Sequence, residues 1–262
     1  MTAHLTTAGL GLAYRGATVV TDAELDFPAG QFTVVVGRNG CGKSTLLRGL
    51  ARLLPPATGS VLLDGADIAR LPARTLARRL GMLPQQPVAP DGITVGDLVG
   101  RGRHPHQRWF RQWSAADDAA VRKALSATGT LELLDRTLDE LSGGQRQRVW
   151  LALAIAQDPE VMLLDEPTTF LDLAHQLDIL DVLRTLLPRT IVAVLHDVNL
   201  AARYADHIVA MKDGRVIAQG APARIVRPEI MFEVFDLECA VIEDPLTGTP
   251  LVIPAPRPGR AA

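Results

Sequence analysis

The sequence predicts an α/β fold, because strand-like and helical segments alternate along most of the chain. Short apolar runs typical of strands resume after residues 94–157, a block whose pattern is helical throughout. The sequence has no internal repeat of fixed period that would indicate a solenoid or a propeller. This order predicts an α/β core, an antiparallel β subdomain at the N-terminus and an inserted α-helical subdomain.

The first elements follow from the spacing of apolar residues. Residues 10–14 and 23–27 alternate as half-buried antiparallel strands do. Residues 32–36 form a continuous apolar run rich in valine, which is typical of a strand buried on both faces. A glycine-rich turn follows, and then a helix is expected over residues 43–54, which ends before two prolines.

The later elements are predicted from the same kinds of signal. Ser114 stands three residues before Asp117, the spacing of a capping box, so a helix is expected to start at Ser114. Residues 212–215 are typical of a hairpin turn that joins strands 208–211 and 216–218. Further strands are expected over residues 60–63, 81–83, 161–164 and 191–195, and a further helix over residues 173–187.

The length of 262 residues suits one α/β domain with an insertion. We expect the core and the β subdomain to comprise residues 1–88 and 157–253, and the helical subdomain to comprise residues 89–156. The tail, residues 254–262, is rich in proline and small residues and is expected to be disordered.

Charge, cysteine content and hydropathy exclude several classes of protein. The net charge is −2, which argues against a general nucleic-acid-binding protein. Cys41 and Cys239 are far apart and lack partners at metal-ligand spacing, which argues against a disulfide scaffold and a structural zinc site. Because the sequence shows neither a secretion signal nor an apolar run of about 20 residues, we expect a cytosolic protein that something else would anchor at a membrane.

A phosphate-binding loop is predicted between the buried strand 32–36 and the helix that follows it. Glycines there let backbone N–H groups turn toward phosphate oxygens, and the helix N-terminus adds a partial positive charge. Lys43 would reach the β- and γ-phosphates of a nucleotide, and the Ser44 hydroxyl would bind Mg²⁺. Because Cys41 lies near Lys43 at a helix start, its thiol is expected to have a lowered pKa. The candidate nucleotide-binding residues are Gly37, Arg38, Asn39, Gly40, Cys41, Gly42, Lys43, Ser44 and Thr45.

The apolar strand 161–164 is followed by two acids, Asp165 and Glu166. Asp165, at the strand end, is expected to hold Mg²⁺ through a water, and Glu166 can accept a proton from an attacking water. Alone, such a pair is more often a solvated turn. Together with the phosphate loop it predicts a nucleotide hydrolase.

Residues 141–148 distinguish this chain from other phosphate-loop proteins. They read Leu-Ser-Gly-Gly-Gln-Arg-Gln-Arg, so that Ser142, Gly143 and Gly144 begin a helix and present an exposed anion site. With Gln145, this segment resembles the signature of the ATP-binding cassette (ABC) family. The resemblance extends from about residue 5 to residue 237, with the motifs in family order, and implies a RecA-like phosphate-loop core that hydrolyses ATP.

The resemblance implies further roles. Two copies of the chain would pair head to tail, so that the signature of one closes over the γ-phosphate held by the other. Tyr14 would stack on adenine and Asp172 would contact the partner copy. The expected catalytic residues are Lys43, Gln85, Glu166 and His196, and the expected Mg²⁺ ligands are Ser44, Gln85 and Asp165.

Two of these roles have alternatives. Tyr14 could simply pack at a strand end, and Gln86 could be the glutamine near Mg²⁺ in place of Gln85. Gln85 also lies at the join of the core and the insertion, where it would couple the ATP site to a partner protein.

The resemblance suggests transport. A chain with one phosphate loop and no membrane segment would act on integral-membrane permease subunits at the cytoplasmic face of the membrane, and indirectly on a substrate-binding protein. Residues 93–106 and 195–204 are similar to ATPases that import ferric siderophores, cobalamin and haem, and residues 100–113 and 165–175 to the ferric-enterobactin type. We expect import of an iron–siderophore complex. Cobalamin or haem import, or a soluble ABC ATPase without a transport role, are the alternatives.

Residues 101–113 mix arginine, histidine and aromatic side chains. Such a segment could be a groove for single-stranded nucleic acid, but the overall charge argues against this interpretation. A solvated loop and a surface that faces the permease remain equally open.

Overall fold

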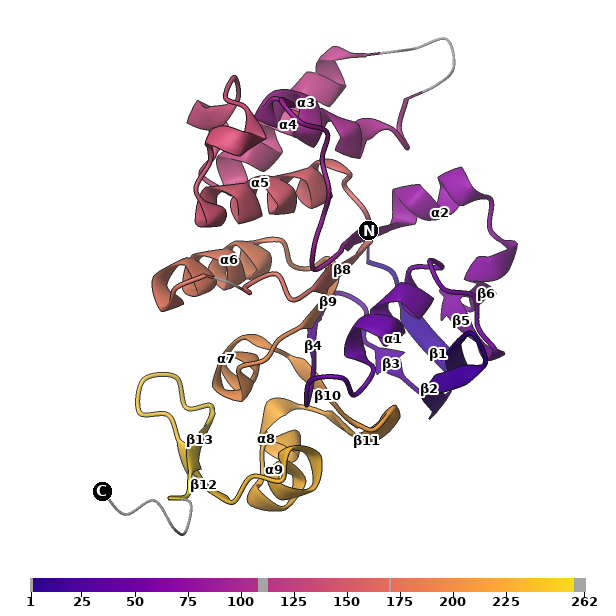
Figure 1. The fold of residues 1–262 in the computed structure, drawn as a ribbon, viewed down its shortest axis with the longest axis vertical. Coiled ribbons are helices and arrows are strands. Elements are labelled where there is room, and N and C mark those ends of the chain that lie inside the picture. Colours follow the sequence, from indigo (N-terminus) through magenta and orange to yellow (C-terminus); the bar gives the residue numbers. More distant parts are fainter. Residues whose placement is uncertain (1, 108–112, 170, 257–262) are drawn as a thin grey trace.

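A six-stranded sheet forms the centre of the computed structural model, which describes residues 2–107, 113–169 and 171–256 (Figure 1). The strand order is β11-β10-β4-β9-β8-β7, and every pair is parallel except β10 and β11. The strands are β4 (Phe32–Gly37), β7 (Leu80–Leu83), β8 (Val161–Asp165), β9 (Thr190–Val194), β10 (His207–Lys212) and β11 (Arg215–Gly220). The predicted α/β class and the predicted hairpin between β10 and β11 are confirmed.

Strand β4 is buried on both faces, as its sequence predicts. Val34 and Val36 pack into a core that includes the helices of the insertion, and Val35 packs into a second core that includes the N-terminal sheet. Side chains along a strand alternate between its faces, so a strand covered on both sides carries mostly apolar residues, and Thr33 is the one polar side chain that β4 buries.

The N-terminal sheet has the order β2-β1-β5-β6, with β3 paired to β1. Its strands are β1 (Leu5–Tyr14), β2 (Ala17–Ala23), β3 (Asp26–Phe27), β5 (Thr58–Leu63) and β6 (Ala66–Asp67). The prediction of one strand over residues 23–27 is wrong, because β2 ends and β3 begins within it. The Thr7 hydroxyl donates to the Ala23 carbonyl (2.6 Å) and accepts from the Leu25 amide (2.9 Å), which replaces strand pairing at this break.

Helix α1 (Lys43–Leu50) lies between the two sheets and is shorter than predicted. Arg52 adopts a left-handed conformation with φ of 58°, which an α-helix does not accommodate. Its guanidinium donates to the carbonyls of Ile68 (2.8 Å) and Leu71 (2.6 Å), so contacts distant in sequence hold the chain in this turn. The helix therefore ends before Pro55 is reached.

The insertion is helical, as predicted, and forms the upper block in Figure 1. Its helices are α3 (Val95–Gly100), α4 (Ala115–Ala127) and α5 (Gly143–Ala156), with 3₁₀ turns η2 (Arg101–Arg103), η3 (Leu131–Leu133) and η4 (Leu138–Glu140). Helix α4 begins after Ser114, whose side chain forms the predicted capping box with Asp117. Before the insertion, between β6 and β7, the chain forms η1 (Ile68–Arg70) and α2 (Ala73–Arg79).

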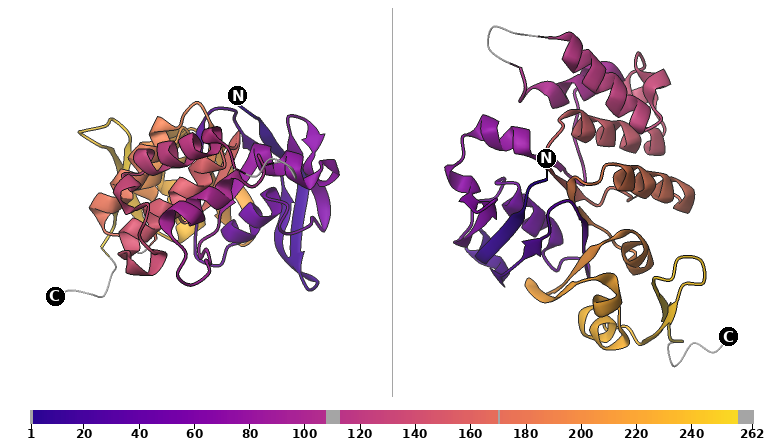
Figure 2. Two further views of the ribbon diagram at one scale, coloured as in Figure 1. Left: turned by 90° about the horizontal axis from the view of Figure 1, so that it is seen from above. Right: turned by 180° about the vertical axis from the view of Figure 1, so that it is seen from behind.

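The C-terminal third begins with α6 (Leu173–Thr185), which lies beside the helical block, and its later elements lie toward the opposite end of the central sheet (Figure 1). Figures 1 and 2 show the helical block, the N-terminal sheet and the C-terminal elements projecting from the centre in three directions. The C-terminal elements are α6 (Leu173–Thr185), α7 (Val198–Tyr204), α8 (Pro222–Ile225), α9 (Pro228–Phe235), β12 (Cys239–Glu243) and β13 (Pro250–Pro254). Helices α8 and α9 and the β12–β13 hairpin were not predicted. Of the predicted disordered tail, residues 257–262 lie outside the described residues.

None of the helices in the described ranges combines the length and the apolar character that crossing a lipid bilayer requires.

Candidate functional site

The phosphate loop follows β4 and takes its shape from two glycines. At Gly37, with φ of 153°, a Cβ atom would lie 2.3 Å from the carbonyl oxygen of Met211 on the neighbouring strand. Gly42, with φ of 103°, directly precedes α1 and lies against the Val19 carbonyl. A side chain would disturb the backbone at either position, so glycine is required at both.

A cavity of about 500 Å³ opens beside this loop. It lies at the carboxyl ends of the central strands, where parallel sheets commonly bind ligands. Val19 and Thr169 belong to none of the motifs that predicted the site, although Thr169 stands only three residues after Glu166. The lining residues are Val19, Asn39, Gly40, Gly42, Lys43, Ser44, Thr45, Gln85, Glu166, Thr169 and His196.

Lys43 and Ser44 are held by hydrogen bonds at the cavity wall. The buried Lys43 ammonium donates to the carbonyl oxygens of Gly37 (2.8 Å) and Arg38 (2.9 Å). The Ser44 hydroxyl donates to Asp165 Oδ1 at 2.9 Å. Burial raises the pKa of the Asp165 carboxyl, against the opposing effect of the Ser44 hydrogen bond. A cation placed beside Asp165 would favour its ionised form.

Three side chains contact the Glu166 carboxylate. The amide of Gln85 (2.6 Å) and the hydroxyl of Thr169 (2.9 Å) donate to Oε2, and His196 Nε2 lies 2.7 Å from Oε1. Glu166 also adopts a left-handed backbone conformation, with φ of 53°. Such strain is characteristic of functional sites, and here it turns the side chain out of the strand direction and into the cavity.

Gln85 and Gln86 differ in their surroundings. Both side chains are exposed, but Gln85 lines the cavity and contacts Glu166, whereas Gln86 does not belong to the cavity wall. This geometry favours Gln85 as the residue that could reach a bound metal.

The expectation of a lowered pKa for the Cys41 thiol is wrong. Its side chain is only 5% exposed, and burial raises the pKa of the thiol even though the Lys43 charge lowers it. Desolvation outweighs the charge because the thiol packs inside the loop, 2.8 Å from where a Gly37 Cβ would stand.

The signature residues lie at the start of α5. Ser142 and Gln145 form a reciprocal capping box, in which the Gln145 amide donates to Ser142 Oγ (3.3 Å) and the Ser142 amide to Gln145 Oε1 (3.0 Å). Gly143 is exposed, and a Cβ at Gly144 would lie 3.5 Å from the His175 ring on α6. None of these residues lines the cavity of the same chain. They form a separate, exposed helix N-terminus.

Tyr14 and Asp172 both lie at the ends of elements. Tyr14 ends β1, is 39% exposed, and its hydroxyl lies 3.4 Å from Arg48 Nη1. Asp172 caps α6 by accepting from the His175 amide (3.0 Å), and its carboxylate lies 2.7 Å from His175 Nδ1. These hydrogen bonds lower the pKa of Asp172. Both side chains are accessible to a ligand or to a second chain.

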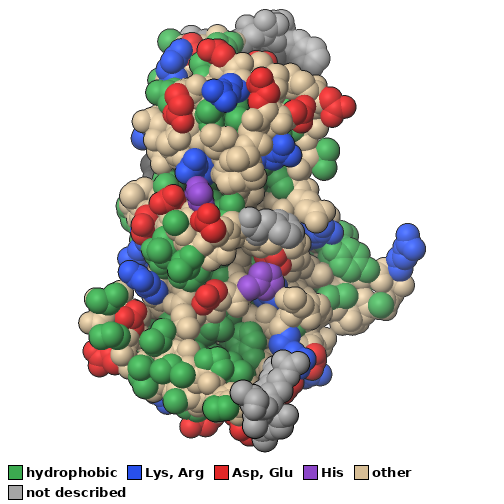
Figure 3. Space-filling model, turned by 60° about the vertical axis from the view of Figure 1, so that its left-hand side comes forward, with side chains coloured by type: hydrophobic (Ala, Val, Ile, Leu, Met, Phe, Trp, Pro, Cys, Tyr) green, Lys and Arg blue, Asp and Glu red, His purple; other side chains and the backbone are tan. Residues whose placement is uncertain are grey.

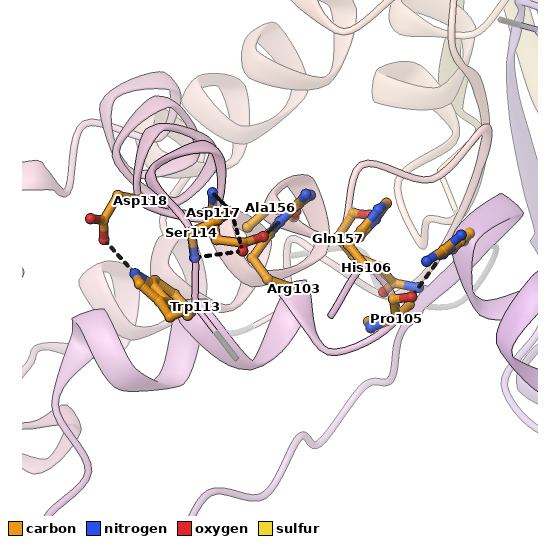
Figure 4. Close-up of polar contacts among 10 residues, drawn as sticks. Arg103, Pro105, His106, Trp113, Ser114, Asp117, Asp118, Ala156 and Gln157 are labelled. Atoms are coloured by element: carbon orange, nitrogen blue, oxygen red, sulfur yellow. Dashed lines mark hydrogen bonds and ion pairs between the residues drawn. The ribbon is translucent and has the colours of Figure 1, made fainter. Parts of the chain in front are cut away.

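Part of segment 101–113 has an internal role, which Figure 4 shows; its residues 108–112 lie outside the described residues. The largely buried Arg103 donates to Asp117 Oδ1 (3.0 Å) and to the Ala156 carbonyl (2.8 Å). His106 Nε2 lies 2.8 Å from the Gln157 carbonyl. These two basic side chains join the segment to α4 and α5 and do not face outward as a nucleic-acid groove requires.

The surface also lacks the footprint of such a groove on the face shown in Figure 3. Acidic and basic side chains are interspersed over the helical block, and hydrophobic side chains gather toward the C-terminal elements.

Comparison with known proteins identifies the family of the chain. Residues 20–169 match the family described as ABC transporter. The chain belongs to the ABC transporter family. This ABC ATPase is 53% identical to the achromobactin transport ATP-binding protein CbrD of Dickeya dadantii (strain 3937) over 253 residues, covering 95% of this chain and 94% of the relative. It is 49% identical to the ferric enterobactin transport ATP-binding protein FepC of Escherichia coli (strain K12) over 251 residues, covering 95% and 93%.

A solved structure agrees over the whole length of the ABC ATPase. A chain of a transporter described as of the metal-chelate type, in an inward-facing conformation, superposes with a TM-score of 0.83 at 28% identity, covering 97% of this chain and 98% of that chain. The predicted phosphate-loop core, N-terminal antiparallel sheet and helical region are thus those of an ABC ATPase.

Proposed function

We propose that this ABC ATPase hydrolyses Mg-ATP in a head-to-tail homodimer and drives uptake of an iron–siderophore complex through a separate membrane permease, at whose cytoplasmic face it lies. The observation that carries the catalytic part is the Glu166 carboxylate, which lines the cavity beside the phosphate loop and is held there by two hydrogen bonds and a contact with His196. A carboxylate fixed in this way can receive a proton from a water that attacks the γ-phosphate.

The residues beside Glu166 fit Mg²⁺. The hydroxyl of Ser44, the carboxylate of Asp165 and the amide oxygen of Gln85 supply the hard oxygen donors that this cation prefers, and the first two already lie 2.9 Å apart. Bound Mg²⁺ would neutralise charge on the β- and γ-phosphates. Lys43 would grip the same phosphates, and His196, already beside Glu166, would contact the γ-phosphate.

The signature supports the dimer. Ser142, Gly143 and Gly144 form an exposed helix N-terminus that does not line the cavity of its own chain. Such a terminus attracts anions through its free N–H groups and its dipole. A second copy placed head to tail would bring its signature, with Gln145, to the γ-phosphate, while Asp172 contacts the partner and Tyr14 stacks on the adenine. ATP would then stabilise the closed dimer and shift the population of the permease states.

The proposed substrate rests on the relatives. Relatives about half identical to this chain over nearly its full length are named for siderophore iron transport, which favours an iron–siderophore complex over cobalamin or haem. The same names favour transport over a soluble ATPase without a membrane partner.

The experiment is uptake of radiolabelled iron, bound to each member of a siderophore panel, in cells that lack this protein. Labelled cobalamin and haem serve as parallel substrates. Loss of uptake for an iron chelate, restored by the wild type and not by Glu166→Gln, is the expected result. Loss confined to cobalamin or haem would replace the proposed substrate, and unchanged uptake of every compound would contradict the transport role.

Gln85→Ala is expected to lower ATP turnover by about tenfold or more, because it removes both a proposed Mg²⁺ ligand and a donor to Glu166. Gln86→Ala is the matched control, since it truncates the neighbouring, exposed glutamine. Steady-state hydrolysis at several Mg²⁺ concentrations measures both. If Gln86→Ala were the more impaired variant, the assignment would pass to Gln86.

A further inference from the structure

We propose that Asp236, at the end of α9, is a positioning residue for ATP binding that acts through Arg38 of the phosphate loop. The proposal rests on the nucleotide-binding role assigned to that loop above. Asp236 lies 198 residues from Arg38 in the sequence and belongs to none of the motifs that predicted the site. It would stabilise the phosphate loop in the conformation that binds the phosphates of ATP.

The Asp236 carboxylate joins two cations from different elements. Its Oδ2 pairs with the Arg38 guanidinium, and its Oδ1 lies 3.0 Å from the Lys212 ammonium at the end of β10. Lys212 also donates to the Glu233 carbonyl near the C-terminal end of α9 (2.6 Å), where a cation is favoured. The C-terminal end of α9 therefore contacts both the phosphate loop and the end of the neighbouring strand β10.

Through Arg38, the contact with Asp236 also affects a backbone carbonyl of the phosphate loop that accepts a hydrogen bond from Lys43. The Arg38 carbonyl oxygen accepts a hydrogen bond from Lys43 Nζ (2.9 Å) and one from the Cys41 amide (3.3 Å). The Arg38 side chain pairs with Asp236 and does not line the cavity, and its neighbour Gly37 packs against Met211, which precedes Lys212. Fixing the Arg38 side chain outside the cavity thus restrains the backbone turn that surrounds the phosphates. A loop held in its binding conformation binds ligand more tightly, because less ordering is needed on binding.

The backbone of Asp236 provides a way to separate this role from helix capping. Asp236 has φ of 52° and ends α9 in the left-handed conformation, which asparagine and glycine adopt at least as readily. Asp236→Asn and Asp236→Gly therefore keep or improve the helix end while they remove the charge. A capping role predicts no change in ATP binding for either variant.

The test measures KM for ATP, kcat and thermal unfolding for Asp236→Asn, Asp236→Gly and Arg38→Gln. We expect KM to rise about two- to fivefold in each, the range of an exposed ion pair, with a smaller change in kcat and no loss of thermal stability for the Asp236 variants. The double variant Arg38→Gln with Asp236→Asn should have a KM no higher than that of the more impaired single variant, because the same interaction is lost in all three. The difference in KM between each variant and the wild type should also become smaller at high ionic strength, because salt screens exposed charges.

Asp158→Asn is the matched control. Asp158 also has φ of 52° and pairs with an arginine, Arg189 (2.5 Å), but it does not line the ATP cavity. Equal KM for wild type, Asp158→Asn and Asp236→Asn would overturn the proposal, as would additive effects in the double variant. Lys43→Ala distinguishes a failure of the Asp236 proposal from a failure of the phosphate-loop assignment. If this variant binds and hydrolyses ATP as the wild type does, the phosphate-loop assignment itself fails.

Discussion

Glu166→Gln is expected to lower ATP hydrolysis by about a hundred- to ten-thousandfold, the usual contribution of a general base, while ATP binding persists. Glutamine has nearly the same shape and keeps an oxygen that can accept from Thr169 or Gln85, but it cannot take up a proton at neutral pH. Lys43, Ser44 and Asp165 are unchanged, so the nucleotide should remain bound. The variant should therefore accumulate as an ATP-bound dimer.

Light scattering in saturating ATP and a steady-state ATPase assay measure the two consequences. Glu132→Gln, which changes an exposed glutamate in the helical region, should behave as the wild type does. A Glu166→Gln protein that stays monomeric in ATP would contradict the dimer proposal, and one that hydrolyses ATP at the wild-type rate would remove Glu166 from the role of base.

Lys43→Ala is expected to lower ATP hydrolysis on the order of a hundredfold or more, because it removes the cation that we propose to face the transferring phosphate. Its ammonium is buried and bonds only backbone carbonyls, those of Gly37 and Arg38, among the described contacts. Those carbonyls would face the phosphates without a compensating charge, so nucleotide affinity should fall as well.

Titration with a fluorescent ATP analogue and the ATPase assay separate affinity from turnover. Lys123→Ala, which truncates an exposed lysine on α4, is the control for loss of a positive charge. Thermal unfolding shows whether the loop has collapsed: a Lys43→Ala protein that unfolds as the wild type does, yet retains hydrolysis, would remove Lys43 from the phosphate site.

The chemistry of the site could be predicted from the sequence because most of it is local. The phosphate loop depends on glycines at fixed distances from Lys43, and the strand that ends at Asp165 and Glu166 is a continuous apolar run. The capping boxes at Ser114 and Ser142 likewise involve residues three apart. In each case the interaction that fixes the structure joins neighbours in the chain, so the pattern of residues contains it.

Tertiary contacts overruled several local expectations. Local sequence allowed α1 to continue to residue 54, but Arg52 turns out of the helix to bond Ile68 and Leu71. A neighbouring lysine predicted a lowered pKa for the Cys41 thiol, but burial raises it. Both outcomes depend on what packs against the residue.

The sequence by itself determined the family and indicated the candidate reacting groups and their order, because these reside in short motifs with fixed spacing. Only the tertiary structure decided which side chains surround Glu166, that Gln85 and not Gln86 lies in the cavity wall, and that Asp236 reaches Arg38. These pairs are separated by up to 198 residues, and they meet because the order of strands in the central sheet brings their ends together. That order is set by the packing of whole elements, which no short stretch of sequence contains.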